Sequence, residues 1–394
     1  MSSFPGITVR ILDESLTTSA SELNSPTIGG LISKDGLDRF VYDATETAQG
    51  YYFVSDLADW FSRLTNWSNT VGHIGFSATN GVTAIAANLA TNGATGWTDE
   101  WYAVHNFLQY GAPCYITWQG SGASADFKLL DIDVAFQGGS GAGYKSLVND
   151  IVNARADTDR PVFGVISIPS DTTITGSMTI GGPSDGNNAC AVFGEKKHFN
   201  VAGSATNIIR TTLAADVAGC IARTDRDYYP WYSPAGSRRG VINNAVGLAK
   251  NLNDSEKALL YSSKLNPVIN IPGEGTLLFG DKSLSSSSSS LTSIGVARLF
   301  IYLKKTISPL ARGVLFEQNN DITRSSFRTA ADSVLSGLVA SNGISEYRII
   351  CDTTNNTPEI IEAKNFVADI LVKPIPSVNF VRITFTNADL SVTF

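Results

Sequence analysis

Residues 130–168, which read LDIDVAFQGGSGAGYKSLVNDIVNARADTDRPVFGVISI, contain the pattern that decides the fold. Apolar residues at 130, 132, 134 and 136 alternate with Asp131 and Asp133, which is the period of a β-strand. A glycine-rich loop at 138–143 leads to a predicted helix at 147–156, and the apolar run at 162–168 lies between two prolines, as expected of a buried strand. A strand, a helix and a buried strand in this order are typical of α/β folds.

Similar signals extend on both sides of this stretch. Before it, we predict a helix at 99–110 and a strand at 114–118. After it, the periodicity predicts helices at 213–223, 254–263, 294–307 and 324–341, a hairpin at 268–279, and strands at 347–351, 367–373 and 380–386. Asp254 is the predicted N-cap of the helix at 254–263. The predicted fold class is therefore α+β / α/β, with a C-terminal core of mixed β-sheet flanked by helices and an outer α/β domain inserted before it.

Both ends of the chain have a sequence pattern that predicts a β-strand set apart from the main fold. Ile7, Val9 and Ile11 alternate along residues 7–12 and are followed by a polar stretch, and the last five residues form a short apolar tail. Because an isolated strand leaves its backbone groups unpaired, each arm needs a sheet edge, either in its own subunit or in a neighbour. Both pairings remain open at this point.

These patterns divide the chain into four predicted parts. Residues 1–24 are the N-terminal arm, 25–204 an outer, variable α/β insertion domain, 205–386 the core domain, and 387–394 the C-terminal arm. The N-terminal arm is expected to belong structurally with the core domain.

The overall charge argues against several classes of partner. Lys and Arg number 29 and Asp and Glu 36, giving a net charge of −7, whereas a protein that coats nucleic acid needs a dense basic surface. Charged residues are 16% of the chain, which fits a surface largely covered by neighbouring subunits. The first ten residues lack a secretory pattern and no apolar run reaches 18 residues, so we expect neither export nor a membrane span.

Motifs for catalysis are scarce. The three histidines have no partner at metal-binding spacing, no nucleophile elbow occurs, and the four cysteines form no CxxC pair, which favours buried thiols. Asp131 and Asp133 lie on one side of a predicted strand and could share a divalent cation, although a solvated strand face is the favoured explanation. We therefore predict no catalytic, cofactor or metal site and no enzyme activity, with a metal-dependent α/β hydrolase using these two aspartates as the alternative.

An ordered series of short motifs resembles the contractile tail sheath proteins of bacteriophages and related injection machines. These motifs are LAADVAG at 213–219, PWYSPAG at 230–236, LNP at 265–267, RLF at 298–300, FEQN at 316–319 and NNTP at 355–358, together with PGITV at 5–9. The resemblance covers about half of the chain, at residues 4–15 and 205–386.

The resemblance implies a structural subunit that polymerises helically around a tail tube and contracts to drive the tube through the host envelope for genome ejection. Its implied partners are further copies of itself, the tail tube protein, and baseplate and tail terminator proteins, with no nucleic acid, membrane or cofactor. It implies a place in the virion tail sheath after assembly in the host cytoplasm. A bacterial contractile injection device and a surface-displayed coat subunit are the alternatives.

Residue roles follow from combining the resemblance with the strand pattern. We expect inter-subunit arm strands to use Ile7, Val9, Ile11, Val392 and Phe394, and the sheet that accepts a neighbour's strand to use Val381, Ile383 and Phe385. Contact with the tube is predicted for Lys304, Lys305 and Arg312. Arg324, Glu317 and Asp321 are expected to form an ion-pair cluster at the start of a helix.

Overall fold

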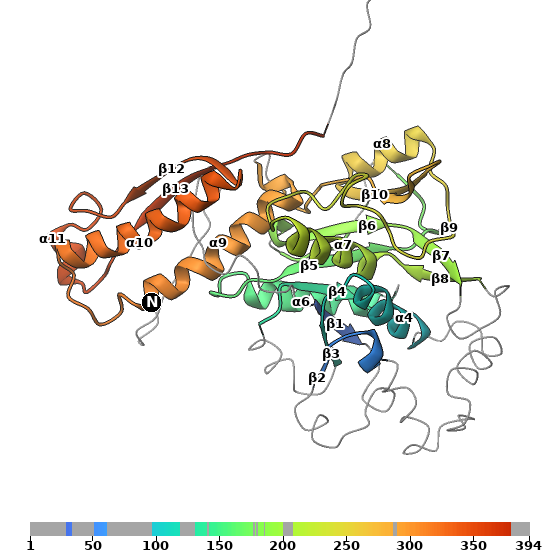
Figure 1. Ribbon diagram of the computed structural model, residues 1–394, viewed down its shortest axis with the longest axis horizontal. Coiled ribbons are helices and arrows are strands. Elements are labelled where there is room, and N and C mark those ends of the chain that lie inside the picture. The colour runs from blue at the N-terminus through green and yellow to red at the C-terminus, as the bar shows by residue number, and fades with distance from the viewer. Residues whose placement is uncertain are drawn as a thin grey trace, which may run out of the picture.

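The computed structural model describes residues 29–33, 51–60, 97–118, 131–139, 142–175, 178, 180–184, 186–199, 208–286 and 290–379. Its largest element is an eight-stranded sheet in the order β11-β10-β6-β5-β4-β1-β3-β2 (Figure 1). The strands are β1 (Gly29–Ser33), β2 (Tyr51–Val54), β3 (Cys114–Trp118), β4 (Val134–Gln137), β5 (Phe163–Ile168), β6 (Ala189–Phe193), β10 (Leu265–Ile271) and β11 (Gly275–Leu278). The six inner strands run parallel, and β2 and β11 pair antiparallel at the two edges.

Helices cover both faces of this sheet. α4 (Trp97–Leu108) and α7 (Ala214–Asp227) pack on one face, and α6 (Ala142–Arg155) and α8 (Asp254–Ser262) on the other. Each face of the sheet therefore has its own hydrophobic core. Side chains of β5 alternate between the two cores, with Phe163 and Val165 in the core beneath α4 and α7, and Ile166 and Ile168 in the core beneath α6 and α8. All six residues of β5 are buried, as the apolar run between prolines predicts.

The sheet connects to a smaller C-terminal unit. It consists of α9 (Ile294–Arg312), α10 (Asp321–Ala340), α11 (Pro358–Glu362) and an antiparallel pair, β12 (Ile344–Ile350) with β13 (Asp369–Pro374). Figure 1 shows α10 and the β12–β13 pair lying together beyond α9, away from the sheet. We call α10, α11, β12 and β13 the distal unit.

The remaining elements are short. β7 (Glu195–Phe199), β8 (Ile208–Thr212) and β9 (Gly247–Leu248) form a three-stranded antiparallel sheet in the order β8-β7-β9. Single 3₁₀ turns occupy Gly186–Asn188 and Ser290–Thr292. Among the described residues, no helix combines the length and apolarity needed to cross a membrane.

The mixed α+β class predicted from the sequence is confirmed, and several predicted bounds are corrected. α6 begins at Ala142, inside the predicted loop at 138–143, and α7 continues to Asp227, beyond the predicted end at 223. Asn253 rather than Asp254 is the N-cap of α8, because its side chain accepts the Glu256 backbone N–H while the Glu256 carboxylate accepts the Asn253 N–H. α9 continues through Pro309 to Arg312, beyond the predicted end at 307. Strands from both sides of residue 204 share the large sheet, since β6 pairs with β10, and the four-part domain division stays a prediction.

Candidate functional site: the α9 joint and the open strand pair

α9 belongs to two hydrophobic cores at once. Ile294, Ala297 and Ile301 recur at helical spacing and pack into the core between the sheet and α7. A second stripe packs against α10, β12 and β13, and consists of Val296, Leu299, Phe300, Leu303 and Ile307. The helix is therefore the joint between the sheet and the distal unit.

A buried ion pair fixes one end of this joint. The Arg298 guanidinium binds the Asp225 carboxylate with both terminal nitrogens, and Nη2 lies 2.7 Å from Oδ2. The side chains of Arg298 and Asp225 are 6% and 8% exposed. A bidentate pair removed from water tolerates little displacement, because separation leaves a buried charge without its counterion.

The two aspartates considered as a metal site bind a lysine of the same joint. Lys305 Nζ lies 3.0 Å from Asp131 Oδ1 and 2.6 Å from Asp133 Oδ1. Burial alone would raise the pKa of Asp131, but the Lys305 ammonium holds it below its ordinary value. Within the described part of the chain, no cluster of three or more acidic, histidine or cysteine side chains could hold a metal ion. The structure thus gives the aspartate pair a cationic partner within the chain and offers no support for a hydrolase site.

The other two residues predicted to touch the tube also contact the sheet region. Lys304 is 2% exposed and donates to the Ala156 carbonyl oxygen at 2.8 Å. Arg312 pairs with Asp159 and keeps 46% of its side chain exposed. Lys304 would have to leave the core to reach a partner, whereas tube contact through exposed Arg312 stays a prediction.

The strand pair of the distal unit has open edges. Among the described residues, β12 and β13 pair only with each other. Ile370 and Val372 face the distal core, and the Tyr347 hydroxyl donates to Asp332 of α10 at 2.8 Å. The predicted arm residues and the predicted accepting strand, Val381, Ile383 and Phe385, lie outside the described residues.

The predicted cluster at the start of α10 is formed with one different member. Arg324 binds Asp321 and the side-chain oxygen of Asn319. Asn319 therefore takes the place that the sequence prediction gave to Glu317. The N-cap is Asn320, whose side chain accepts the Thr323 N–H at 2.9 Å.

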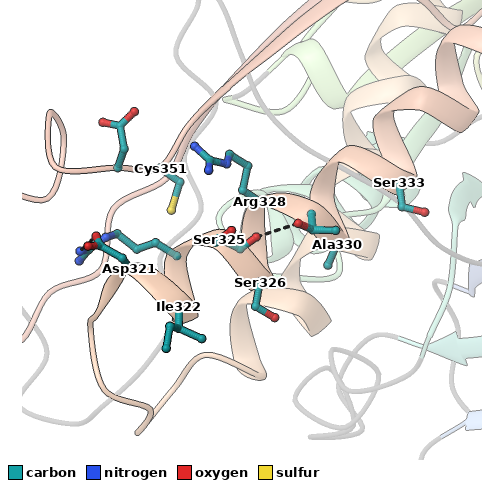
Figure 2. A pocket seen from close by; sticks show the side chains of 11 residues that line it. Asp321, Ile322, Ser325, Ser326, Arg328, Ala330, Ser333 and Cys351 are labelled. Atoms are coloured by element: carbon teal, nitrogen blue, oxygen red, sulfur yellow. Dashed lines mark hydrogen bonds and ion pairs between the residues drawn. The ribbon is translucent and has the colours of Figure 1, made fainter.

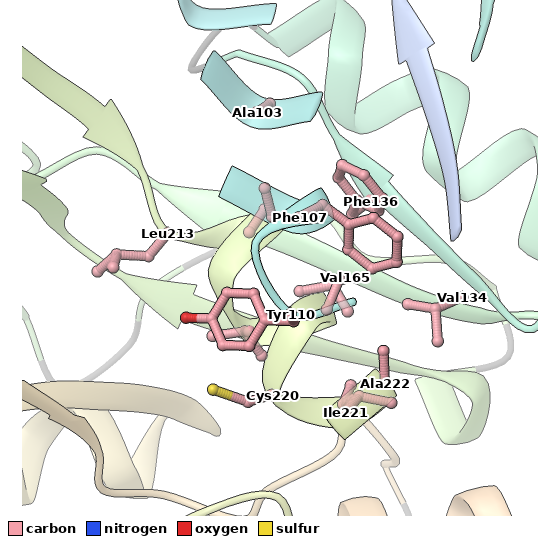
Figure 3. Close-up of a cluster of buried hydrophobic side chains, with 14 of the residues drawn as sticks. Ala103, Phe107, Tyr110, Val134, Phe136, Val165, Leu213, Cys220, Ile221 and Ala222 are labelled. Atoms are coloured by element: carbon pink, nitrogen blue, oxygen red, sulfur yellow. The ribbon is translucent and has the colours of Figure 1, made fainter. Parts of the chain in front are cut away.

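A buried polar cluster between β7 and α7 was not predicted from the sequence. Lys196 Nζ lies 2.8 Å from Asp216 Oδ1, and both side chains are fully buried. The Tyr110 hydroxyl donates to Asp216 at 3.2 Å and accepts the Asn243 N–H at 2.9 Å. Figure 3 shows Tyr110 beside Cys220 of α7, and a Cβ at Gly219 would come within 2.2 Å of the Tyr110 ring. Glycine is required there because the ring lies directly on the helix backbone.

The four cysteines are buried thiols. Burial raises the pKa of Cys220 to about 12 and that of Cys351 to about 11, and raises the pKa of Cys190 further. Thiols that stay protonated are poor nucleophiles, so these cysteines serve packing.

Two family models match consecutive parts of the chain. The phage tail sheath protein central domain matches residues 139–284, and the phage tail sheath C-terminal domain matches residues 286–387. The chain belongs to the phage tail sheath family. The boundary between the two sheath domains falls shortly before α9, so the α9 joint holds the C-terminal sheath domain on the central one.

Curated sheath proteins share substantial identity over part of their length. The chain is 45% identical to the tail sheath protein of Enterobacteria phage T4 over 173 residues, which are 44% of this chain and 26% of that protein. It is 41% identical to the tail sheath protein of Vibrio phage KVP40 over 182 residues, 46% of this chain and 27% of that protein. The match therefore spans about a quarter of the length of these relatives.

Solved sheath structures share the fold over nearly the whole chain. The sheath complex of the extracellular contractile injection system PVC, in its contracted state, matches with a TM-score of 0.71 and 18% identity, covering 98% of both chains. The contracted helical sheath of the anti-feeding prophage matches with a TM-score of 0.68 and 17% identity, covering 98% of this chain and 100% of that chain.

Proposed function

We propose that this chain is a structural, non-enzymatic subunit of a contractile sheath that polymerises helically around a tail tube and contracts to drive the tube through the host envelope. The observation that carries the proposal is the pair of consecutive sheath domains joined by α9 into one fold. Heterologous contacts that do not close into a ring generate such open helical stacks.

The open β12–β13 pair supplies a means of linking subunits. A strand of a neighbouring subunit can satisfy the free backbone groups of an open edge by β-augmentation. The apolar alternation at residues 7–12 and the tail at 390–394 are suited to this role, and residues 13–24 provide a polar tether that permits rotation.

Contraction needs no nucleotide in this proposal. The extended sheath is a kinetically trapped state with less favourable subunit packing, and the energy is stored at assembly. A lone two-state unit needs a bias of about 5.5 kcal/mol to move from 1:99 to 99:1. Arms that persist through the change couple many subunits, so a smaller bias for each subunit is sufficient.

The proposed partners are other copies of the chain, the tail tube, the baseplate and a tail terminator protein. The proposed location is the virion tail, after assembly in the host cytoplasm. The net charge of −7 supports the absence of a nucleic-acid partner.

A second candidate is the sheath of a bacterial contractile injection device. It is favoured by the likeness in fold to injection-system sheaths, which extends over 98% of this chain in both structures. Labelling the chain with antibody on native particles separates the two roles. A DNA-filled head above the labelled tail supports a virion, and a headless tail supports a device.

Electron microscopy of the concentrated protein tests the sheath proposal. We expect hollow tubes or stacked rings from the intact chain and folded monomers after deletion of residues 1–15. The triple variant Ile7→Asp, Val9→Asp, Ile11→Asp should also stay monomeric, whereas Thr8→Ala with Arg10→Ala, on the opposite side of the strand, should form tubes. Normal tubes from the deletion would refute the arm assignment, and monomers at every concentration with and without a co-expressed tube would refute the sheath role.

A further inference from the structure

An open groove runs along the first half of α10. Its volume is about 1000 Å³, and Figure 2 shows Ser325, Arg328 and Cys351 around it. Ile322, which is 81% exposed, adds an apolar contact, and Asp352 also contributes to the lining. The groove therefore combines an exposed apolar side chain with serine hydroxyls and a guanidinium.

The two arginines of the groove differ in their partners. Arg324 is 5% exposed and is bound to Asp321 and Asn319. Arg328 is exposed and makes no ion pair or hydrogen bond with any residue that the structure describes. The nearby Asp352 carboxylate uses its Oδ1 to accept both the backbone N–H and the hydroxyl of Thr354, and these hydrogen bonds, with a weaker attraction from Arg328 that forms no ion pair, lower its pKa. Arg328 is thus available to an anionic partner from outside the subunit.

The groove adjoins the open edge of the strand pair. α10 runs toward the sheet, where Ser341 after its end accepts a hydrogen bond from Trp231, and β12 runs back outward along it, with Tyr347 bound to Asp332. The C-terminal end of β12 leads directly into Cys351 and Asp352, which line the groove. A strand added along the edge of β12 would pass the groove at this end.

One terminal segment of the chain carries a net charge opposite to that of Arg328. Residues 1–28 include a single cationic side chain, Arg10, against Asp13, Glu14 and Glu22, and the acidic pair at 13–14 immediately follows the predicted strand at 7–12. Residues 380–394 carry Arg382 and Asp389 and are balanced. Charge complementarity therefore selects the N-terminal segment over the C-terminal one.

We propose that the groove centred on Arg328 binds Asp13 and Glu14 of a second copy of this chain, and that this contact sets the register of the arm strand along β12. The inference rests on the proposed sheath function and adds the charged contact that determines where the arm strand binds along β12. Because the acidic pair follows the arm strand and the groove lies at the C-terminal end of β12, the arm strand runs parallel to β12. A register fixed by charge prevents the slippage to which a short alternating strand is prone.

Cross-linking between copies tests the direction of the arm. Ser15→Cys combined with Ser325→Cys in the groove leaves every charge in place, and a short bis-maleimide should join subunits into ladders on a denaturing gel. The matched control combines Ser15→Cys with Ser345→Cys, which is exposed at the opposite end of β12. Ladders from the control alone, or from neither pair, would overturn the proposal.

Charge reversal tests the contact itself in the full-length chain. We expect Arg328→Glu to raise the protein concentration needed for sedimentable tubes about tenfold or more, and the triple variant Arg328→Glu, Asp13→Arg, Glu14→Arg to restore tubes. Arg238→Glu, a reversal at another exposed arginine, is the matched control and should leave assembly unchanged. Unchanged assembly by folded Arg328→Glu, or no rescue in the triple variant, would overturn the proposed contact while leaving the sheath role standing. Absence of tubes from the wild-type chain, with and without a co-expressed tail tube, would instead count against the sheath role.

Discussion

The sheet region and the distal unit differ in what they do with some of their charged side chains. In the sheet region, Lys196 and Asp216 are fully buried and paired with each other. In the distal unit, Arg328 and Arg348 are exposed and outside any ion pair among the described residues, and the strand pair has open edges. A region that satisfies its polar groups internally keeps its shape, whereas one that leaves them available can bind a neighbour.

Acid should destabilise the sheet region far more than the distal unit. Burial lowers the pKa of both His105 and His198 to about 4. His198 is held neutral between the Thr211 hydroxyl at 3.1 Å and the Phe199 carbonyl at 3.0 Å. Between pH 6.5 and about 4 the unfolded chain binds more protons, so the free energy of unfolding falls by about 1.4 kcal/mol per pH unit for each histidine.

Urea unfolding between pH 7 and 4.5 measures this effect. The double variant His105→Asn, His198→Asn should lose less stability on acidification than the wild type. Burial raises the pKa of Asp216, so this residue changes the free energy of unfolding with pH in the opposite direction. Because Asp216 is present in both proteins, the difference between their pH slopes reports the two histidines. Residues 286–394 contain no histidine, so amide protection in α10 should depend less on pH than protection in α4. Parallel slopes for wild type and variant would contradict the prediction.

Breaking the ion pair of the joint should have the next largest effect. Arg298→Met leaves the Asp225 carboxylate, which is 8% exposed, without its cation. Removing one partner of a buried pair costs about 3–5 kcal/mol, and replacing both partners by apolar residues costs much less. We expect Arg298→Met to lower the free energy of unfolding by this amount and Arg298→Met with Asp225→Leu to recover most of it, as measured by circular dichroism in urea. A double variant as unstable as the single one would show that packing rather than charge holds α9.

Replacing a tyrosine by phenylalanine in each region has the smallest expected effects and compares the two regions most directly. Tyr110→Phe removes a hydroxyl that binds both Asp216 and the Asn243 N–H in a buried site, which should cost about 1–3 kcal/mol. Tyr347→Phe removes one hydrogen bond to Asp332 near solvent and should cost about 0.5–1 kcal/mol. Thermal unfolding of both variants measures the two losses of stability. Equal losses would mean that the two hydroxyls contribute alike and that the two regions do not differ in how they use polar groups.

Periodicity predicted the strands and helices that have strong apolar patterns. β5 and the hairpin of β10 and β11 agree with the predicted runs because their burial follows directly from their residue types. β7 was missed, since its sequence EKKHF places a lysine and a histidine in the interior. β1 was missed because five residues beginning with two glycines carry little strand signal.

The α9 joint was predicted only in pieces. The sequence drew attention to Asp131 and Asp133 as one site and to Lys305 as another, and the structure joins them into a single site. More than 170 residues separate these partners, so no local pattern could link them. Pairing at such distance depends on the order of strands in the sheet, which periodicity does not specify.

The double membership of α9 in two cores also has a mechanical consequence. At 1.5 Å per residue its 19 residues make a rod about 28 Å long. Because the rod is clamped to the sheet at several points along its length, a small rotation of the sheet becomes a larger sweep of the strand pair beyond the tip. In the proposed sheath, α9 would then act as a lever arm, and its stiffness would determine how much torque passes from one subunit to the next.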